Sequence, residues 1–361
     1  MLFIGLGTVV HVNASHVSMH LAKPQPQVPF HHHFSTLRCI SSSSGFPCSV
    51  SLSHSTTPSC GIGLKLTPFS LMMATQLQVS EGAPSEQDSG SSPSLPIGEH
   101  DLLIVGPGVL GRLVAEQWRK EYPGCQVFGQ TITTNHHEEL IKMGITPSLN
   151  WTKATQKFPY VIFCAPPYQS SDYLGDIRLA ALCWNGEGSF LYTSSSAPYD
   201  CNDNGLCDED TPVVPIGRSP RTDVLLKAEN VVLEFGGSVV RLSGLYKEER
   251  GAHAYWLEKG IVESRPDHVL NLIHYEDAAS LSIAILKKQF RGRIFLGCDN
   301  HPLSRQEVMD LVNKSGKFSK KFEKFTGSDD PLGKRLNNSK TRQEIGWEPK
   351  YSSFAHFLDT I

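Results

Sequence analysis

Residues 106–111 read GPGVLG and lie between an apolar run, DLLIVG (101–106), and an amphipathic stretch at 109–120. The run predicts a buried strand and the stretch predicts a helix, so the glycines occupy a strand-to-helix turn. In such a turn the first glycine permits the tight reversal, the second lets a pyrophosphate approach the backbone, and the third lets the helix pack on the strand. The free N–H groups at the helix start favour an anion. The predicted dinucleotide contacts are Gly106, Gly108, Val109, Leu110 and Gly111.

Apolar runs and helical patterns continue to alternate after this turn. Further strands are predicted at 125–130, 160–165, 189–194 and from 238, and helices at 135–143, 171–184 and 220–235. This alternation predicts an α/β fold, a doubly wound parallel sheet of the Rossmann type with helices on both faces. The second half is less regular, with strand patterns at 269–275 and 293–297 and helix patterns at 276–288 and 304–313. We expect a smaller C-terminal substrate-binding region from about residue 247.

The end of the second predicted strand reads FGQTITTN (128–135) and holds neither a carboxylate nor an arginine. A carboxylate at this place usually bonds the adenosine ribose, and its absence removes a repulsion against a 2′-phosphate. The sequence therefore favours NADP over NAD, with Gln130 and Thr131 as predicted contacts. The threonine hydroxyls either bond that phosphate or cap the helix predicted at 135. In FCAPP (163–167), Ala165 and Pro166 would let the cofactor lie close to the next loop.

Residues 100–361 resemble an atypical extended short-chain dehydrogenase/reductase, of the NAD-dependent epimerase/dehydratase type and of the kind found in plant chloroplasts. The motifs that carry the resemblance are GPGVLG, TSSSAPY (193–199), DEDTP (208–212), RLSGLY (241–246), NLIHYEDAA (271–279) and KTRQEIGWEPK (340–350). The resemblance implies a dinucleotide in the N-terminal part and a small or nucleotide-sugar-like substrate in the smaller C-terminal part. It places Ser195 on the serine that bonds the reacting oxygen, with Tyr199 in the same loop. The alternative is that the Ser195 hydroxyl only satisfies the backbone at a strand end.

The helix after residue 219 departs from the pattern that this family shares. Its Ser-Pro opening at 219–220 and its Glu229 fit, but Arg221 stands where the family has the catalytic tyrosine and Leu225 where it has the lysine. Lys227 lies two residues out of register, which turns a helix by about 200°. An arginine stays protonated and cannot shuttle a proton. The usual proton path of the family is therefore absent from this sequence.

Elsewhere the sequence offers other candidates for the missing pair. The sequence YWLEK places Tyr255 and Lys259 at the right spacing, but after RLSGLY, so we interpret the match as chance. Arg218 and Arg221 are predicted to clamp an anionic substrate or the cofactor phosphates. Ser195 and Tyr199 remain the catalytic candidates.

The segment DCNDNGLCDED (200–210) imitates the first half of a calcium-binding loop. Its twelfth position is Thr211 instead of a bidentate glutamate, and a strand precedes it, so no metal site is predicted. The alternative is a loose cation site at the surface. Cys201 and Cys207 lie six residues apart and form either a redox-regulated disulfide or two free thiols.

The N-terminal residues differ in composition from the remainder of the chain. The first 80 residues contain no Asp or Glu, three Lys or Arg and 14 Ser. This composition is typical of an organelle transit peptide and predicts import into the chloroplast stroma. The alternative is a true start at Met19, Met72 or Met73. We expect residues 1–75 to be a disordered transit peptide, 76–99 a linker, and 100–361 the folded part.

The net charge and the hydropathy of the chain limit the classes of partner that it is expected to bind. Beyond residue 80 the chain has 30 basic and 36 acidic residues, which argues against general nucleic-acid binding. The apolar run at 2–10 is too short to span a bilayer, so no membrane partner is predicted. Two functions stay open. One is a reductase or epimerase with a non-standard proton path, and the other is a non-catalytic dinucleotide-binding regulatory, assembly or RNA-associated factor in the chloroplast.

Overall fold

The computed structural model describes residues 96–149, 154, 156–329 and 331–361. The predicted transit peptide (1–75) and most of the predicted linker (76–99) lie outside the described residues. The statements below concern the unit that runs from Gln87 to Ile361.

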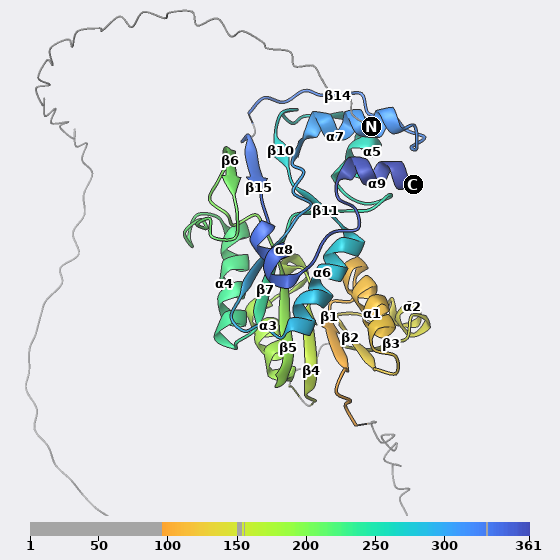
Figure 1. Ribbon diagram of the computed structural model, residues 1–361, viewed down its shortest axis with the longest axis vertical. Coiled ribbons are helices and arrows are strands. Elements are labelled where there is room, and N and C mark those ends of the chain that lie inside the picture. The colour runs from red at the N-terminus through yellow and green to blue at the C-terminus, as the bar shows by residue number, and fades with distance from the viewer. Residues whose placement is uncertain (1–95, 150–153, 155, 330) are drawn as a thin grey trace, which may run out of the picture. The chain divides into compact units, whose positions relative to one another are not determined.

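A seven-stranded parallel sheet forms the centre of this unit (Figure 1). Its strands, in spatial order, are β3 (Ile145–Leu149), β2 (Val127–Thr131), β1 (Leu102–Val105), β4 (Phe158–Phe163), β5 (Trp184–Ser195), β7 (Ser238–Leu242) and β12 (Ile294–Gly297). The chain runs outward from β1 to β3, then returns to place β4 on the other side of β1. The point where the order reverses lies between β1 and β4, which is where open α/β sheets bind ligands. The predicted doubly wound α/β fold is confirmed.

Helices cover both faces because successive strand residues point to opposite sides. Leu102 and Ile104 of β1 belong to the core with α1 (Val109–Glu121) and α6 (Tyr275–Lys288). Leu103 and Val105 belong to the other core, with α3 (Tyr173–Cys183) and α4 (Pro220–Glu234). Strands buried on both faces explain why DLLIVG and YVIFCA read as continuous apolar runs. A short helix, α2 (His137–Lys142), leads into the edge strand β3.

A smaller part of the chain has its own sheet, of order β13-β10-β15-β6, and its own aromatic-rich core. The elements of this part are β6 (Asp203–Cys207), β8 (Gly244–Tyr246), α5 (Ala252–Lys259), β9 (Ile261–Val262), β10 (Val269–Leu270), β11 (Leu272–His274), β13 (Leu303–Ser304), α7 (Arg305–Ser315), β14 (Lys324–Phe325), β15 (Gly333–Leu336) and α9 (Phe354–Thr360). Helix α8 (Ser339–Ile345) packs on α6 and β12 of the larger part. Strand β6 comes from the loop that leads to α4, yet it pairs with β15 near the C-terminal end. The connection between β5 and α4 is therefore shaped by both parts.

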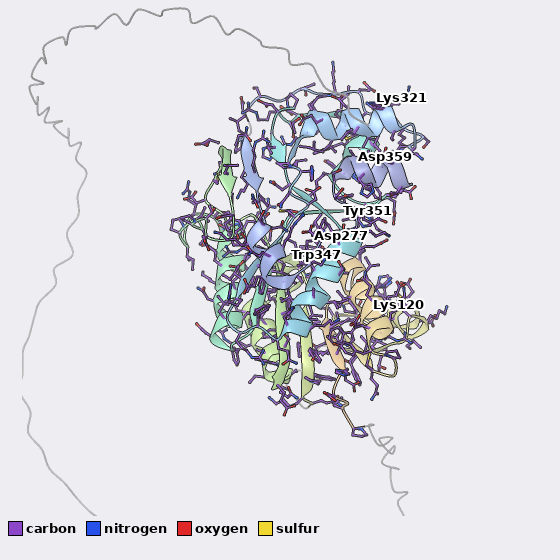
Figure 2. The ribbon with its side chains drawn as sticks, viewed as in Figure 1. Lys120, Asp277, Lys321, Trp347, Tyr351 and Asp359 are labelled. Atoms are coloured by element: carbon purple, nitrogen blue, oxygen red, sulfur yellow. The ribbon has the colours of Figure 1, made fainter. Side chains whose placement is uncertain are left out.

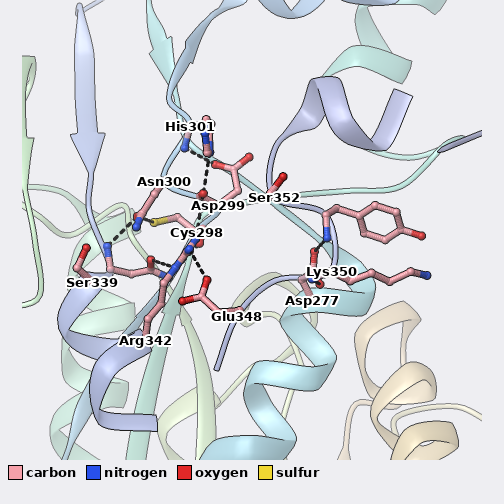
Figure 3. A network of polar contacts seen from close by, with 12 residues as sticks. Asp277, Cys298, Asp299, Asn300, His301, Ser339, Arg342, Glu348, Lys350 and Ser352 are labelled. Carbon is pink, nitrogen blue, oxygen red and sulfur yellow. Dashed lines mark hydrogen bonds and ion pairs between the residues drawn. The ribbon is translucent and has the colours of Figure 1, made fainter. Parts of the chain in front are cut away.

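The KTRQEIGWEPK segment joins the two parts through a polar network (Figure 3). The Arg342 guanidinium donates to Asn338 Oδ1 at 2.9 Å, to Glu348 Oε2 at 2.7 Å and to the Asp299 carbonyl at 3.0 Å. Burial raises the pKa of the Asp299 carboxyl, which follows β12, to about 7.

The C-terminal end of the KTRQEIGWEPK segment contacts helix α6. Figure 2 labels Trp347 and Tyr351 near the start of that helix, close to Asp277. The Trp347 indole N–H donates to Ser280 Oγ at 2.9 Å, and the Tyr351 amide donates to Asp277 Oδ2 at 3.1 Å. Burial raises the pKa of the Asp277 carboxyl to about 6.

No helix among the described residues is both long and apolar enough to cross a membrane. The six cysteines of the described part are free thiols, Cys201 and Cys207 included.

Candidate functional site

The turn after β1 has the geometry that its glycines predict. Gly106 has a φ of +78°, and a Cβ on it would lie 2.6 Å from the backbone N and Cα of Ala165. A Cβ on Gly111 would lie 2.9 Å from Ile104 Cγ2. No side chain larger than hydrogen fits at either position, so the turn stays tight and α1 packs directly on β1.

Gly108 differs from the other two glycines because a Cβ on it would meet no atom within 4 Å. It is exposed and is the N-cap of α1, whose first turn holds no acidic residue and no side-chain cap. The side chain of Leu110 packs in the core, and Val109 is half-buried, so what this turn offers a ligand is its backbone N–H groups. Together with the helix dipole they form an anion site at the carboxyl edge of the sheet.

The carboxyl end of β2 presents an unpaired hydrogen-bond donor. Gln130 is 4% exposed, and its Nε2 has no partner among the described residues. A buried amide without a partner is unfavourable, and a ligand reaches this one only if the Gln130 side chain turns toward the surface. The Thr131 hydroxyl is already engaged, at 2.9 Å from the Thr133 carbonyl and 2.7 Å from His137 Nε2.

The predicted threonine cap of the following helix is wrong. Helix α2 begins at His137, two residues later than predicted, with His136 at the N-cap and no side-chain cap. The Thr134 backbone carbonyl, not its hydroxyl, accepts from the His137 amide.

Ala165 and Pro166 follow β4 and face the glycine turn across the switch point. The Cys164 amide donates to the Val105 carbonyl at 2.8 Å, which extends the β1–β4 pairing to the turn itself. The Ala165 carbonyl accepts from the Tyr173 hydroxyl at 2.9 Å. These bonds hold the small Ala165 against Gly106.

Neighbouring serines at the end of β5 have different surroundings. Ser194 is buried, and its hydroxyl donates to Glu229 Oε1 at 2.6 Å. Ser195 is half-buried, and its Oγ accepts from the Ala197 amide at 3.2 Å. No acceptor among the described residues receives the proton of the Ser195 hydroxyl, so that proton is available to a ligand at the edge of the sheet.

Glu229, which accepts from the Ser194 hydroxyl, also forms a buried ion pair. Its carboxylate, on α4, lies 2.7 Å from Arg241 NH2 on β7, and the two side chains are 2% and 5% exposed. The Arg241 guanidinium also lies 4.7 Å from the centre of the Tyr199 ring. The cation therefore has a charged partner on one side and an aromatic face on the other.

The prediction of Tyr199 as a catalytic residue is wrong. Its side chain is 1% exposed and its hydroxyl is buried without a partner among the described residues. Burial raises the pKa of the phenol to about 12, although the nearby Arg241 lowers it. Tyr199 forms an isolated backbone bridge with Val213, and its ring packs in a buried cluster with Leu296 and Leu336, which the spacing of the motif did not reveal.

Helix α4 has the register that the sequence predicts. Leu225 is 9% exposed and lies on the inner face with Glu229, whereas Arg221 and Lys227 are exposed. Ser219 occupies the N-cap, but its hydroxyl makes no capping bond. Position 225 on the inner face is therefore apolar, whereas the family that the sequence resembles has a ribose-binding lysine there.

The remaining sequence candidates lie at the surface. Arg218 faces Asp200 at 3.9 Å, and Arg221 has no ion-pair partner in the part of the chain that the structure describes. The chance pair, Tyr255 and Lys259, lies on the exposed side of α5, where Tyr255 is 58% exposed.

The carboxylates of the acidic loop at 208–210 find their partners within the protein. Lys340 forms ion pairs with Asp208, at 2.8 Å, and with Asp210, and the Thr341 amide donates to Glu209 Oε1. The described residues contain no group of three His, Cys, Asp or Glu side chains arranged to hold a metal ion.

Sequence reasoning missed Lys334, on β15. Its ammonium donates to the carbonyls of Ser196 at 3.3 Å, Ala197 at 3.4 Å and Tyr199 at 2.5 Å. These partners are more than 130 residues away in the sequence, so no local pattern could have indicated them.

Two cavities, of about 350 Å³ and 430 Å³, lie at the opposite edge of the sheet, near the amino ends of its strands. His100 and Tyr122 line the first, and Lys157 and Tyr160 line the second. Neither contains a residue of the glycine turn or of the β5 end. Backbone geometry and unpaired polar atoms, more than cavity size, identify the carboxyl edge as the candidate site.

Comparisons with known proteins agree with this architecture. No protein-family model matches the sequence, and neither does any curated protein. Among solved structures, a functionally unknown conserved protein from Silicibacter pomeroyi is 22% identical, with a TM-score of 0.59 over 72% of this chain and 97% of that one. The dTDP-glucose 4,6-dehydratase of Bacillus anthracis, in complex with NAD, is 14% identical, with a TM-score of 0.58 over 72% and 94%.

A third structure, the UDP-glucose 4-epimerase of Thermotoga maritima with UDP-glucose, is 15% identical, with a TM-score of 0.55 over 72% of this chain and 96% of that one. At such identities the likeness concerns the fold. The chain thus has the Rossmann-like α/β fold that these epimerase and dehydratase structures share.

Proposed function

We propose that the protein binds an NAD(P) dinucleotide at the carboxyl edge of its seven-stranded sheet. The observation that carries the proposal is the open backbone at Gly108, which caps α1 beside the β1–β4 switch point. Gly106 and Ala165 leave the turn without side chains that would block a pyrophosphate. The solved dehydratase with this fold was determined with NAD, which supports the choice of ligand.

The group at the end of β2 supports NADP over NAD. The Gln130 side-chain amide is a donor without an acceptor among the described residues, and it meets a ligand once its buried side chain turns toward the surface. A phosphate oxygen accepts from such a donor, whereas a carboxylate at this position would repel the phosphate. NADP has a 2′-phosphate and NAD does not, so this phosphate is the acceptor that distinguishes the two nucleotides.

We expect NADPH to bind at least about tenfold more tightly than NADH, a difference of about 1.4 kcal/mol. Gln130→Glu should reverse this order because its carboxylate repels the phosphate and accepts from ribose hydroxyls. Fluorescence titration of both nucleotides against both proteins measures the effect. Equal affinities in the native protein would refute the role of Gln130.

The chemistry available at this edge favours a binding role. Arg221 remains charged, Leu225 has no polar group, and the buried phenol of Tyr199 holds its proton to about pH 12. We therefore infer that the bound dinucleotide serves as a structural or sensing ligand of a regulatory factor.

A reductase or epimerase is the second candidate, and the Ser195 hydroxyl favours it. That group lies at the end of β5 with its proton free to bond a substrate oxygen. Nucleotide sugars are substrates of solved enzymes with the same fold, which makes them the substrate class to test first.

Restoring the missing pair tests the second candidate. The double variant Arg221→Tyr with Leu225→Lys should raise NADPH oxidation with a small aldehyde, p-nitrobenzaldehyde, by at least about tenfold, because a paired lysine lowers the pKa of a tyrosine acid. Leu225→Lys alone is the matched control and should show no gain. A double variant that folds, binds NADPH and shows no gain would count against a latent reductase site.

A further inference from the structure

Lys334 has surroundings that are unusual for a lysine. Its ammonium is partly buried and all three of its bonds go to backbone carbonyls of one short segment, Ser196–Tyr199. It forms no ion pair in the described part of the chain. Burial lowers the pKa of Lys334, although the nearby Cys207, Cys201 and Asp200 oppose the shift. Because the partly buried ammonium bonds three carbonyls of this one segment, it holds the segment in a single arrangement.

The geometry of one peptide group links Lys334 to Ser195. In a trans peptide the C=O and the N–H point in opposite directions. The Ser196 carbonyl points at Lys334, so the amide of Ala197, which belongs to the same peptide group, points away from it. That amide donates to Ser195 Oγ at 3.2 Å. Lys334 and Ser195 share no hydrogen bond, but the peptide between them contacts both.

The amide bond fixes what the Ser195 hydroxyl can do. Its oxygen already accepts one N–H, and its proton has no acceptor among the described residues. A hydroxyl oriented in this way donates to an incoming oxygen without first breaking a bond of its own. The strand end that carries it lies on the same edge as the glycine turn.

We propose that Lys334 is a positioning residue that, through the Ser196–Ala197 peptide, holds the Ser195 hydroxyl ready to donate to a carbonyl or hydroxyl oxygen of a ligand bound beside the dinucleotide. The inference rests on the proposed function for its ligand, but its geometry can be tested without one. Lys334 belongs to the smaller sheet, so that sheet contributes to the order of the site at the edge of the larger one.

Amide hydrogen exchange of Ala197, measured by NMR on the full chain, tests the link in a double-mutant cycle. Lys334→Met removes the ammonium and keeps the aliphatic stem, and Ser195→Ala removes the acceptor. Each should raise the exchange rate of the Ala197 amide about tenfold, the loss of one hydrogen bond. The double variant should exchange no faster than the faster single variant, because both changes break the same bond.

If the Ala197 amide of the double variant exchanged about a hundredfold faster than in the native protein, the two single effects would multiply. That result would overturn the proposal, because Lys334 would then stabilise the loop independently of Ser195. Unchanged exchange in Lys334→Met would overturn it as well. Lys340→Met is the matched control, since Lys340 contacts only the acidic loop and should leave Ala197 unaffected. The Cys164 amide in the sheet serves as the internal reference for global unfolding.

Lys334→Arg keeps a cation and its donors and covers the case in which Lys334→Met does not fold. It should hold the Ala197 exchange rate within about threefold of the native value, since a charged donor is retained. A tenfold rise in this folded variant would contradict the proposal. NADPH titration of the same proteins separates the two claims: native protein that fails to bind NADPH refutes the proposed function, while multiplied exchange rates in a protein that binds NADPH refute only the role of Lys334.

Discussion

Gly108→Val is expected to lower the affinity for NADPH by at least about a hundredfold, a loss of about 2.7 kcal/mol. The valine methyl groups would occupy the open space at the start of α1, where the pyrophosphate has to approach the backbone. The fold should survive, because the φ of Gly108 is −77°, which other residues adopt, and because a Cβ there meets nothing within 4 Å. Fluorescence titration measures the affinity and chemical denaturation the free energy of unfolding.

Gly106→Val is the contrasting control. Its φ of +78° and the 2.6 Å approach to Ala165 forbid a side chain, so this variant should lose stability as well as binding. Comparing the two variants separates a loss of affinity caused by a blocked ligand from a loss caused by a destabilised turn. A Gly108→Val protein that binds NADPH as tightly as the native protein would remove the glycine turn from the proposed site.

Glu229→Ala is expected to lower the free energy of unfolding by about 3–5 kcal/mol, because it leaves the Arg241 guanidinium buried without its carboxylate. The melting temperature should fall on the order of 10 °C for a domain of this size. Ser194 loses its acceptor in the same variant, which adds to the effect. Thermal unfolding followed by circular dichroism measures the change.

Two variants show whether burial is the cause. Glu116→Ala breaks the exposed ion pair of Glu116 with Lys120 and should change stability by no more than about 0.5 kcal/mol. Glu229→Leu with Arg241→Met replaces both charges by apolar groups and should recover most of the loss. If Glu229→Ala and Glu116→Ala had equal effects, the buried pair would not stabilise the fold.

The sequence predicted the features that depend on local geometry. The glycine turn and the register of α4 follow from residues within a few positions of one another, and the structure has both. Strand β3 and helix α5 were not anticipated. The first is a half-polar edge strand that contains Pro147, and the second follows Gly251, which offers no side-chain cap. Neither has the periodicity that marks an element from its sequence.

Contacts between distant segments account for the features of the site that the sequence did not indicate. Tyr199 matches the spacing of a catalytic loop, but its burial depends on Val213 and on Arg241, from another strand. The EF-hand-like segment at 200–210 contains strand β6 because β15 pairs with it from more than 120 residues away. The surroundings of Lys334 arise from the same pairing.

The pairing of β6 with β15 also bears on the order in which a ribosome delivers the parts of this fold. During synthesis the seven-stranded sheet can be completed once β12 has emerged, yet β6 then still lacks β15, with which it pairs. Until about residue 336 has been made, β6 is an open strand edge and the Ser196–Tyr199 carbonyls have no ammonium to bind. The nascent chain thus acquires its glycine turn early and the order of its β5 loop last, and in that interval the exposed edge is open to pairing with other chains.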